Sequence, residues 1–447
     1  MNVLEIAIRE EEKNSDMLSV LFIVFFLCMF IGIPIAFSIG LGSLAAFLTG
    51  NSSMIAVFPQ RLWSGMDSFS LMAVPLFILA GNLMEEGGTS KRLVDFANLL
   101  VGRFRGGLGK VAVVSSMIFA GISGSGSADT SAIGSIMIPP LKDNKYEDAF
   151  IAPLIASGGT IGPIIPPSLM MVIYCTISGL SVGAMFFAGV IPGILMGLSL
   201  IVVVHMYALK HPEVDEKTLG KKFSLGEAWN IFKGASFALL MPVVIIGSIV
   251  LGICTATEAA SIAIFLALVG GFFVYRELSW EAIPRILNKS AVTTATVMMI
   301  VGMASTMSWL LSIKAFPQLM TDFMLGLAHN KYVFLLLVIL MLSIAGTFMD
   351  STAALLIFVP VLSPLCTAYG VDPIQFAIVC IMVMHVGTIT PPVGVLLYLA
   401  CGMTGVKLGV TLKYLLPMFI ALTIAIILTA FIPPMSLLLP KLAGLIT

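Results

Sequence analysis

Two short segments of this chain place hydroxyl-bearing side chains beside an acidic residue within otherwise apolar sequence. Residues 123–130 read Ser-Gly-Ser-Gly-Ser-Ala-Asp-Thr, and residues 346–352 read Gly-Thr-Phe-Met-Asp-Ser-Thr. Hydroxyl, carbonyl and carboxylate oxygens are the ligands that hard cations such as Na⁺ accept. Irregular backbone inside an apolar segment must be buried in protein or line a cavity, because unpaired amides in hydrocarbon cost several kcal/mol each. The two segments therefore indicate cation sites.

A Gly-Thr-Ile-x-Pro segment follows each of these runs after a stretch of mostly apolar residues. The first copy occupies residues 159–163, with further prolines at 166 and 167, and the second occupies residues 387–391. Proline interrupts a helix and frees backbone carbonyls. A hairpin tip that faces a broken helix would form one oxygen-rich cage in each half, so the pattern predicts at least two ion sites.

The composition places the chain in a membrane. Of its 447 residues, 59% are hydrophobic and 10% are charged, whereas soluble domains carry roughly 25% charged residues. The formal net charge of zero argues against a nucleic-acid partner. All six cysteines lie in apolar stretches without CxxC spacing, which favours a packing role over disulfides or zinc. We expect no cofactor and no enzymatic activity.

The apolar segments are long, and several are cut by glycine and proline. A straight helical crossing needs about 20 residues, so segments 111–141, 150–180, 332–367 and 374–405 are better explained as hairpins or broken helices. We also expect a break near Gly32–Pro34, and an amphipathic surface segment over 276–289. The candidate spans are 18–48, 53–84, 111–141, 150–180, 183–209, 234–274, 291–325, 332–367, 374–405 and 411–439.

The order of motifs repeats once along the chain, and the flanks of the two copies differ in charge. Residues 312–366 hold two basic residues, whereas residues 91–145 hold seven: Lys91, Arg92, Arg103, Arg105, Lys110, Lys142 and Lys145. Excess Lys and Arg mark cytoplasmic loops, so the two copies face opposite sides. The prediction is an all-α integral membrane fold, an inverted-repeat secondary transporter with its site at the repeat interface.

The two acidic residues and three nearby side chains each allow two interpretations. Asp129 and Asp350 are costly within a membrane and are functional candidates, yet each could instead cap the helix that follows it. Helix N-termini at the tips favour an anion. Lys314 could contact a substrate carboxylate or only extend to the interface, and His385 is expected mainly to pack. The small residues could also merely allow close helix packing, and the prolines merely kink helices.

These motifs, with the overall length, resemble the large membrane subunit of tripartite ATP-independent periplasmic (TRAP) transporters, the DctM/SiaM type. The resemblance covers the chain from about residue 17. It implies two re-entrant hairpins, near 115–141 and 335–365, with two broken helices in a mobile elevator-type transport domain around a scaffold. It also implies sodium-driven uptake of a small organic acid, of the sialic acid or C4-dicarboxylate class, through the bacterial inner membrane. A periplasmic substrate-binding protein and a small four-helix membrane subunit would be the partners.

The resemblance and the motifs together assign residues to roles. The expected segments are a polar N-terminal segment (1–16), N-terminal scaffold helices (17–110), a first transport unit (111–209), a cytoplasmic loop with further scaffold helices (210–330), and a second transport unit with the C-terminal helix (331–447). The expected substrate-binding residues are Ser125, Ser168, Lys314, Ser351 and Thr352. The expected sodium-binding residues are Ser123, Ser125, Ser127, Asp129, Gly159, Thr160, Gly346, Thr347, Asp350, Gly387, Thr388 and Thr390.

Three other functions compete with this one. A stand-alone sodium/dicarboxylate symporter shares the two-hairpin design, but its tips typically carry Ser-Asn-Thr where this chain has Ala-Asp-Thr and Asp-Ser-Thr. An intramembrane aspartyl protease could use Asp129 and Asp350 as a dyad, but its Gly-x-Gly-Asp motif is not met. A channel would need an open polar pore, for which the sequence gives no sign.

Overall fold

The computed structural model describes the backbone of all residues except 1–2, 51, 217–223 and 447, and the regular secondary structure of that part is all helical. The helices are α1 (Val3–Ile31), α2 (Ile35–Gly50), α3 (Val57–Met66), α4 (Ala73–Glu86), α5 (Thr89–Val101), α6 (Gly107–Ser123), α7 (Gly126–Asp143), α8 (Asp148–Gly159), α9 (Leu169–Ser178), α10 (Val182–Lys210), α11 (Leu225–Val250), α12 (Ala256–Val269), α13 (Ala282–Ile313), α14 (Phe316–Leu327), α15 (Lys331–Phe348), α16 (Ser351–Ala368), α17 (Pro373–Gly387), α18 (Val395–Thr404), α19 (Leu408–Phe431) and α20 (Pro434–Leu442).

The chain is a membrane protein. Within the described residues, eight helical segments are long and apolar enough to cross a bilayer. Large apolar side chains are exposed along the outer helices, among them Phe30 and Leu416. Such a surface is stable against lipid rather than water.

Helix breaks divide several of the long apolar spans that the sequence predicted. The first apolar stretch breaks between α1 and α2, at residues 32–34, which confirms the predicted break. Span 234–274 divides into α11 and α12, and span 291–325 into α13 and α14. Residues 282–289, part of the stretch expected at the membrane surface, form the first turns of the 32-residue helix α13, and their position relative to the membrane remains a prediction.

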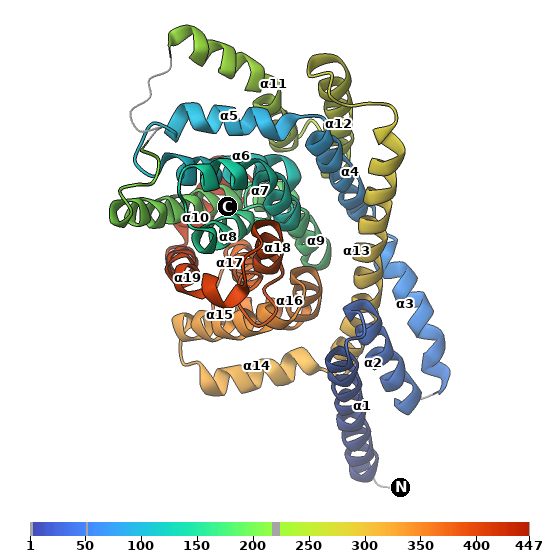
Figure 1. Cartoon of the computed structure of the whole chain (residues 1–447). Coiled ribbons are helices and arrows are strands. Elements are labelled where there is room, and N and C mark those ends of the chain that lie inside the picture. The colour runs from blue at the N-terminus through green and yellow to red at the C-terminus, as the bar shows by residue number, and fades with distance from the viewer. Residues whose placement is uncertain (1–2, 51, 217–223, 447) are drawn as a thin grey trace.

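The helices form two groups that lie side by side (Figure 1). The arm group consists of α1–α4, α12 and α13, with α13 packed on α2, α3 and α4. The core group consists of α6–α10 and α15–α19, in which helices from the first half of the chain pack on helices from the second, such as α7 on α18 and α10 on α19. Helix α13 contacts α16 and so joins the two groups.

Two helical hairpins lie in the core group at corresponding places in the two halves. The first pairs α6 with α7 and the second pairs α15 with α16, and each is followed by a helix, a turn and a shorter helix: α8 and α9, then α17 and α18. The hairpins and helix breaks that the sequence predicted over 111–180 and 332–405 are therefore confirmed as local structure. The domain boundaries remain a prediction.

A buried carboxylate anchors the base of the first hairpin. The Asp215 carboxylate accepts hydrogen bonds from the Tyr146 hydroxyl, at 2.6 Å, and from the Leu108 backbone N–H, at 3.1 Å. Burial raises the pKa of Asp215 although these donors and the nearby Lys110 lower it. The contacts join the loop after α10 to the start of α6 and to the α7–α8 turn.

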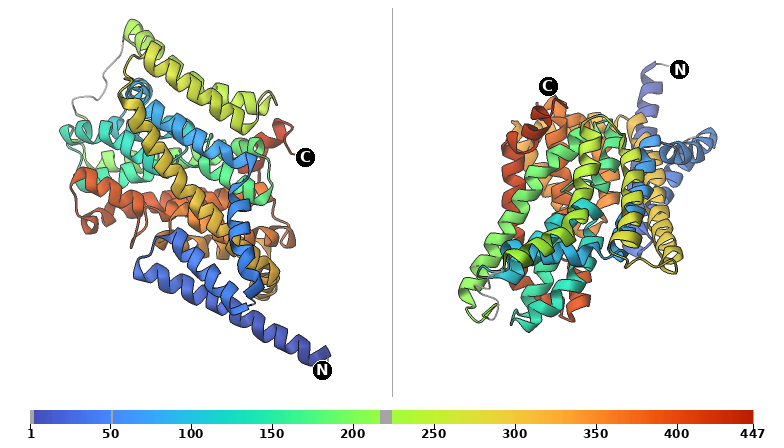
Figure 2. Two further views of the ribbon diagram at one scale, coloured as in Figure 1. Left: turned by 90° about the vertical axis from the view of Figure 1, so that its right-hand side faces the viewer. Right: turned by 90° about the horizontal axis from the view of Figure 1, so that it is seen from above.

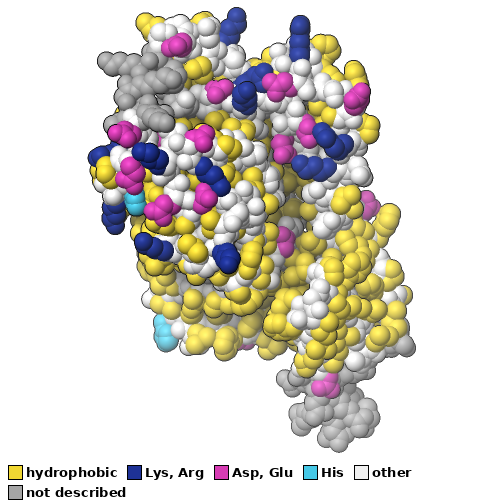
Figure 3. Space-filling view, viewed as in Figure 1, with side chains coloured by type: hydrophobic (Ala, Val, Ile, Leu, Met, Phe, Trp, Pro, Cys, Tyr) yellow, Lys and Arg dark blue, Asp and Glu magenta, His cyan; other side chains and the backbone are white. Residues whose placement is uncertain are grey.

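Basic residues gather on one face of the molecule. Lys and Arg side chains gather in the upper and left-hand parts of the face shown in Figure 3. Seen from above, the C-terminal end of α10 lies on that face, and both chain ends lie on the opposite one (Figure 2). By the excess of basic residues, we assign the face in Figure 3 to the cytoplasm.

Candidate functional site

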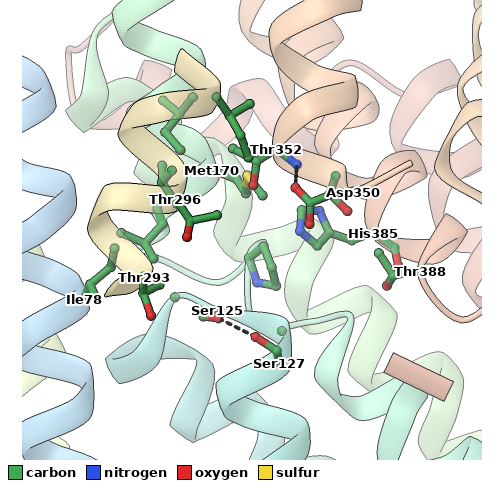
Figure 4. A pocket seen from close by; sticks show the side chains of 18 of the residues that line it. Ile78, Ser125, Ser127, Met170, Thr293, Thr296, Asp350, Thr352, His385 and Thr388 are labelled. Atoms are coloured by element: carbon green, nitrogen blue, oxygen red, sulfur yellow. Dashed lines mark hydrogen bonds between the residues drawn. The ribbon is translucent and has the colours of Figure 1, made fainter. Parts of the chain in front are cut away.

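The tips of the two hairpins meet at one cavity of about 410 Å³ (Figure 4). The first tip contributes residues 124–127 and the second contributes residues 350–352, while helix α13 closes the cavity from the arm group. A volume of this order accommodates a small organic molecule. The interface between the two repeats, where the sequence predicted the site, therefore holds a cavity.

The first tip presents an open helix end to the cavity. Helix α6 ends at Ser123, and Gly124 takes the left-handed conformation (φ +59°) that lets the chain reverse, which suits a residue without a Cβ. Helix α7 then begins after Ser125, whose hydroxyl lies 3.3 Å from that of Ser127 and makes no capping bond. The first backbone N–H groups of α7 are thus not capped by a side chain.

The second tip is built differently, because its acidic residue caps the helix. The Asp350 carboxylate accepts hydrogen bonds from the backbone N–H groups of Thr352, at 2.9 Å, and Ala353, at 3.4 Å. The neighbouring Ser351 hydroxyl donates to the carbonyl of Met384 on α17. The capping interpretation is therefore confirmed for Asp350, whose side chain also lines the cavity.

Asp129 has a different position, and the capping interpretation is wrong for it. It lies inside the first turn of α7, four residues after the N-cap Ser125, and is fully buried. Neither carboxyl oxygen makes a hydrogen bond to a described residue, although the Ser116 side chain is near enough to interact with it. Asp129 does not line the cavity. A buried carboxyl group that makes no hydrogen bond is costly, so its presence here points to a role beyond packing.

Three glycines bring backbone oxygens together behind the first tip. A Cβ on Gly126 would lie 2.9 Å from the Gly159 carbonyl oxygen, and one on Gly162 would lie 3.1 Å from the Ser125 carbonyl oxygen. A Cβ on Gly159 would clash with the hydroxyl of Thr130, which donates to the Gly126 carbonyl at 2.8 Å. The hairpin tip and the end of α8 thus approach each other closely, with carbonyl oxygens between them.

The second tip packs on the end of α17 in a corresponding way. Gly346 and Gly387 are in backbone contact, and the Val393 N–H donates to the Thr347 carbonyl at 3.3 Å. Thr388 lines the cavity, whereas the Thr390 hydroxyl donates to the Val386 carbonyl at 3.0 Å. Thr160, the counterpart of Thr388, is fully buried and donates to the Ser157 carbonyl.

Two of the predicted substrate residues lie outside the cavity. Ser168 is fully buried and caps α9, with its hydroxyl bonded to the Pro163 carbonyl. Lys314 ends α13, fourteen residues beyond Ile300, the last cavity-lining residue of that helix, and so about 21 Å away along the axis. His385 is buried, as expected of a packing residue, but its side chain also lines the cavity.

The arm-group wall of the cavity was not predicted from the sequence. Thr293 and Thr296 of α13 point toward the hairpin tips (Figure 4). Each hydroxyl donates to the carbonyl four residues earlier, at 3.0 Å, and its oxygen can still accept a hydrogen bond. Two threonines three residues apart lie on one helix face, which is the signal that could have identified them.

A second cavity of about 180 Å³ adjoins the first and shares Ser125, Ser127 and Thr293 with it. It extends between α4 and α13 to Glu85 and Lys289, whose side chains form an ion pair at 3.0 Å. These helix ends lie on the basic face. The two cavities together thus lead from the hairpin tips toward the side that we assign to the cytoplasm.

Comparison with known proteins identifies relatives along nearly the whole chain. The family model of the tripartite ATP-independent periplasmic transporter, DctM component, matches residues 22–435. The chain is 38% identical to the sialic acid TRAP transporter large permease protein SiaM of Vibrio cholerae, over 93% of this chain and 96% of that one. It is 37% identical to the C4-dicarboxylate TRAP transporter large permease protein DctM of Pseudomonas aeruginosa, over 91% and 95%.

A solved structure shares the fold at low sequence identity. The YdaH transporter of Alcanivorax borkumensis superposes with a TM-score of 0.60 and 13% identity, over 86% of this chain and 91% of that one. This likeness concerns the fold alone, whereas the family match covers the hairpin tips, the broken helices and the cavity wall described above. The chain belongs to the large membrane components, DctM, of the tripartite ATP-independent periplasmic (TRAP) transporters.

Proposed function

We propose that the chain is the large permease of a sodium-coupled TRAP transporter that imports a small organic anion, of the sialic acid or C4-dicarboxylate class, through the bacterial inner membrane. The observation that carries this proposal is the single cavity at which both hairpin tips meet. The names of the two relatives above support the substrate class. Both of these relatives are transport permeases, which favours transport over proteolysis.

The open N-terminus of α7 gives the cavity its preference for an anion. The lining residues of the cavity include no Lys or Arg, and Asp350 is the acidic one among them. The N–H groups of residues 126–128 have no side-chain cap, and unpaired N–H groups at a helix start carry partial positive charge toward a bound anion. We assign the substrate carboxylate to this helix end. The hydroxyls of Ser125, Thr293 and Thr296 would form hydrogen bonds with the other polar groups of the substrate.

Sodium binding is proposed at the two places where a hairpin tip meets a broken helix. In the first half, the carbonyls of Ser125, Gly126 and Gly159 converge near Thr130. In the second half, Asp350 and Thr388 line the cavity beside the Gly346–Gly387 contact. Oxygen donors of this kind suit Na⁺. Two sodium sites beside one bound anion would couple the binding of sodium to the binding of the anion.

The arrangement of the two helix groups supports an elevator motion. The hairpins would be re-entrant, and the core group would move as one body against the arm group and carry the cavity between the two faces. The family's tripartite character supports the two partners, a periplasmic substrate-binding protein that delivers the anion and a small four-helix membrane subunit beside the arm group.

The test is uptake into proteoliposomes that contain this chain and the small subunit. Labelled sialic acid or a C4-dicarboxylate is supplied outside, with and without the binding protein, under an imposed sodium or proton gradient. We expect accumulation only with sodium and the binding protein together. Sodium-driven uptake that ignores the binding protein would instead establish a stand-alone symporter, and proton-driven uptake would refute the sodium assignment.

A further inference from the structure

A second large concavity lies far from the hairpin tips, on the outer side of the core group. It is a groove of about 770 Å³ between α10 and α19. These helices lie side by side at the edge of the molecule opposite α13 (Figure 1). None of the residues that line the groove is part of the transport site described above.

The walls of the groove are apolar side chains that face outward. Val202 and Met206 of α10 are 56% and 55% exposed, and Leu416, Ile420 and Ile424 of α19 are 59%, 49% and 51% exposed. Exposed apolar side chains on a membrane helix contact hydrocarbon. The apolar walls are therefore suited to contact the acyl chain of a lipid.

One end of the groove is basic, and it lies at the cytoplasmic end of both helices. Lys210 ends α10, and Lys413 lies in the first turns of α19. In the part of the chain that the structure describes, neither lysine forms an ion pair. The nearby glutamates have other partners: Glu213 pairs with His211 at 3.3 Å, and Glu147 accepts from the Tyr414 hydroxyl at 2.9 Å.

The length of the groove corresponds to one leaflet of a bilayer. From Lys210 to Ser199, the farthest lining residue on α10, eleven residues rise about 17 Å. Half of a hydrocarbon core is about 15 Å. Aromatic rings form the floor of the groove beneath its basic end: Tyr207 stacks on Phe150, with ring centroids 3.6 Å apart, and Tyr414 lies beside them. This is the depth at which tyrosine side chains meet lipid headgroups.

We propose that this groove binds one anionic phospholipid of the cytoplasmic leaflet, with its phosphate between Lys210 and Lys413 and an acyl chain along α10 and α19. Basic pockets between membrane helices on the cytoplasmic side are suited to anionic headgroups. Lys413 lies over the Tyr414 ring at 5.3 Å, but within the described residues neither lysine has an acidic partner. This favours an anionic lipid over an apolar helix of a partner subunit, because such a helix would leave both charges without an anion.

Native mass spectrometry of the full chain in detergent, titrated with palmitoyl-oleoyl phosphatidylglycerol or the matching phosphatidylcholine, tests the proposal. We expect one tight phosphatidylglycerol site, roughly tenfold or more stronger than the phosphatidylcholine site. Lys210→Gln with Lys413→Gln should remove that preference. The matched control is Lys91→Gln with Lys407→Gln, two exposed lysines that do not line the groove, and it should retain the preference.

A variant that fills the groove distinguishes lipid binding at a defined site from nonspecific attraction of anionic lipid to basic residues. Ala421→Trp keeps both lysines but blocks the groove, which Ala421 lines, and should weaken phosphatidylglycerol binding. Equal binding of the two lipids by the unaltered chain, or unchanged preference in the double-lysine variant, would refute the proposal. A Cys at Ile420 that cross-links to the small membrane subunit would show that a protein helix occupies the groove instead.

Discussion

Gly346 and Gly387 pack backbone against backbone where the second hairpin meets α17. A Cβ on Gly387 would lie 2.7 Å from the Gly346 Cα and 2.8 Å from its carbonyl carbon. Since both neighbours are backbone atoms, no side chain can rotate away to make room. The contact fixes the distance between the tip that carries Asp350 and the turn that carries Thr388.

Gly387→Ala should therefore displace the second hairpin and reduce sodium-driven uptake by roughly tenfold or more, which corresponds to about 1.4 kcal/mol at the site. Gly402→Ala is the matched control, because a Cβ there meets nothing within 4 Å and alanine favours the helix. The measurement is the initial uptake rate of protein reconstituted in equal amounts. Equal rates for the two variants would contradict the importance of the contact.

Asp129→Ala and Asp350→Ala should each cripple uptake, but with different effects on stability. Asp350→Ala removes the cap of α16 and should lower the stability by about 1 kcal/mol, whereas Asp350→Asn preserves a cap. Asp129→Ala removes a buried carboxyl group whose oxygens make no hydrogen bond to a described residue and should not lower the melting temperature in detergent. Wild-type uptake by correctly inserted Asp129→Ala and Asp350→Ala variants would refute the assignment of both residues.

Thr293→Val and Thr296→Val should raise the KM for the organic anion while the sodium dependence stays unchanged. Each removes one hydroxyl from the cavity with little change in volume, and a lost hydrogen bond of about 1 kcal/mol corresponds to roughly fivefold in KM. Thr306→Val is the control, because Thr306 lies buried on the same helix away from the cavity. Uptake kinetics at several substrate and sodium concentrations distinguish the two effects.

Lys289→Gln should slow the uptake of an anion at low ionic strength more than at high ionic strength. Lys289 lies where the second cavity approaches the cytoplasmic face, and the attraction of an exposed charge is screened by salt. The pair with Glu85 is partly exposed, so its loss should leave stability nearly unchanged. Arg285→Gln, which breaks the ion pair with Glu86 one turn away, is the control. An equal salt dependence of uptake in both variants would argue against passage of the anion through the second cavity.

Local sequence patterns predicted the parts of the site that depend on backbone geometry. Proline and glycine limit where a helix can continue, and the breaks before Ser125 and after Gly159 and Gly387 lie where these residues occur. The role of Asp129 was harder to predict, because an aspartate at the N-cap position and one a single helical turn later, which is buried, look alike in the sequence. Local sequence does not show that Ser125, four residues earlier, begins the helix.

The contribution of α13 depends on tertiary packing, which the sequence pattern does not reveal. Thr293 and Thr296 occur in an ordinary apolar helix, and only the approach of the hairpin tips gives them a role. Lys314 was attractive because basic residues are scarce in the second half, but the length of α13 carries it away from the cavity. Helix length, rather than residue type, decided its position.

The cavity has walls of two origins: the hairpin tips belong to the core group, and α13 belongs to the arm group. If the core group moves, the bound substrate moves away from α13 and contacts different residues on the other side of the membrane. Substrate range and energy coupling can then evolve separately. Substitutions in the stationary wall would change which acid is accepted, while the machinery that harnesses the ion gradient stays intact.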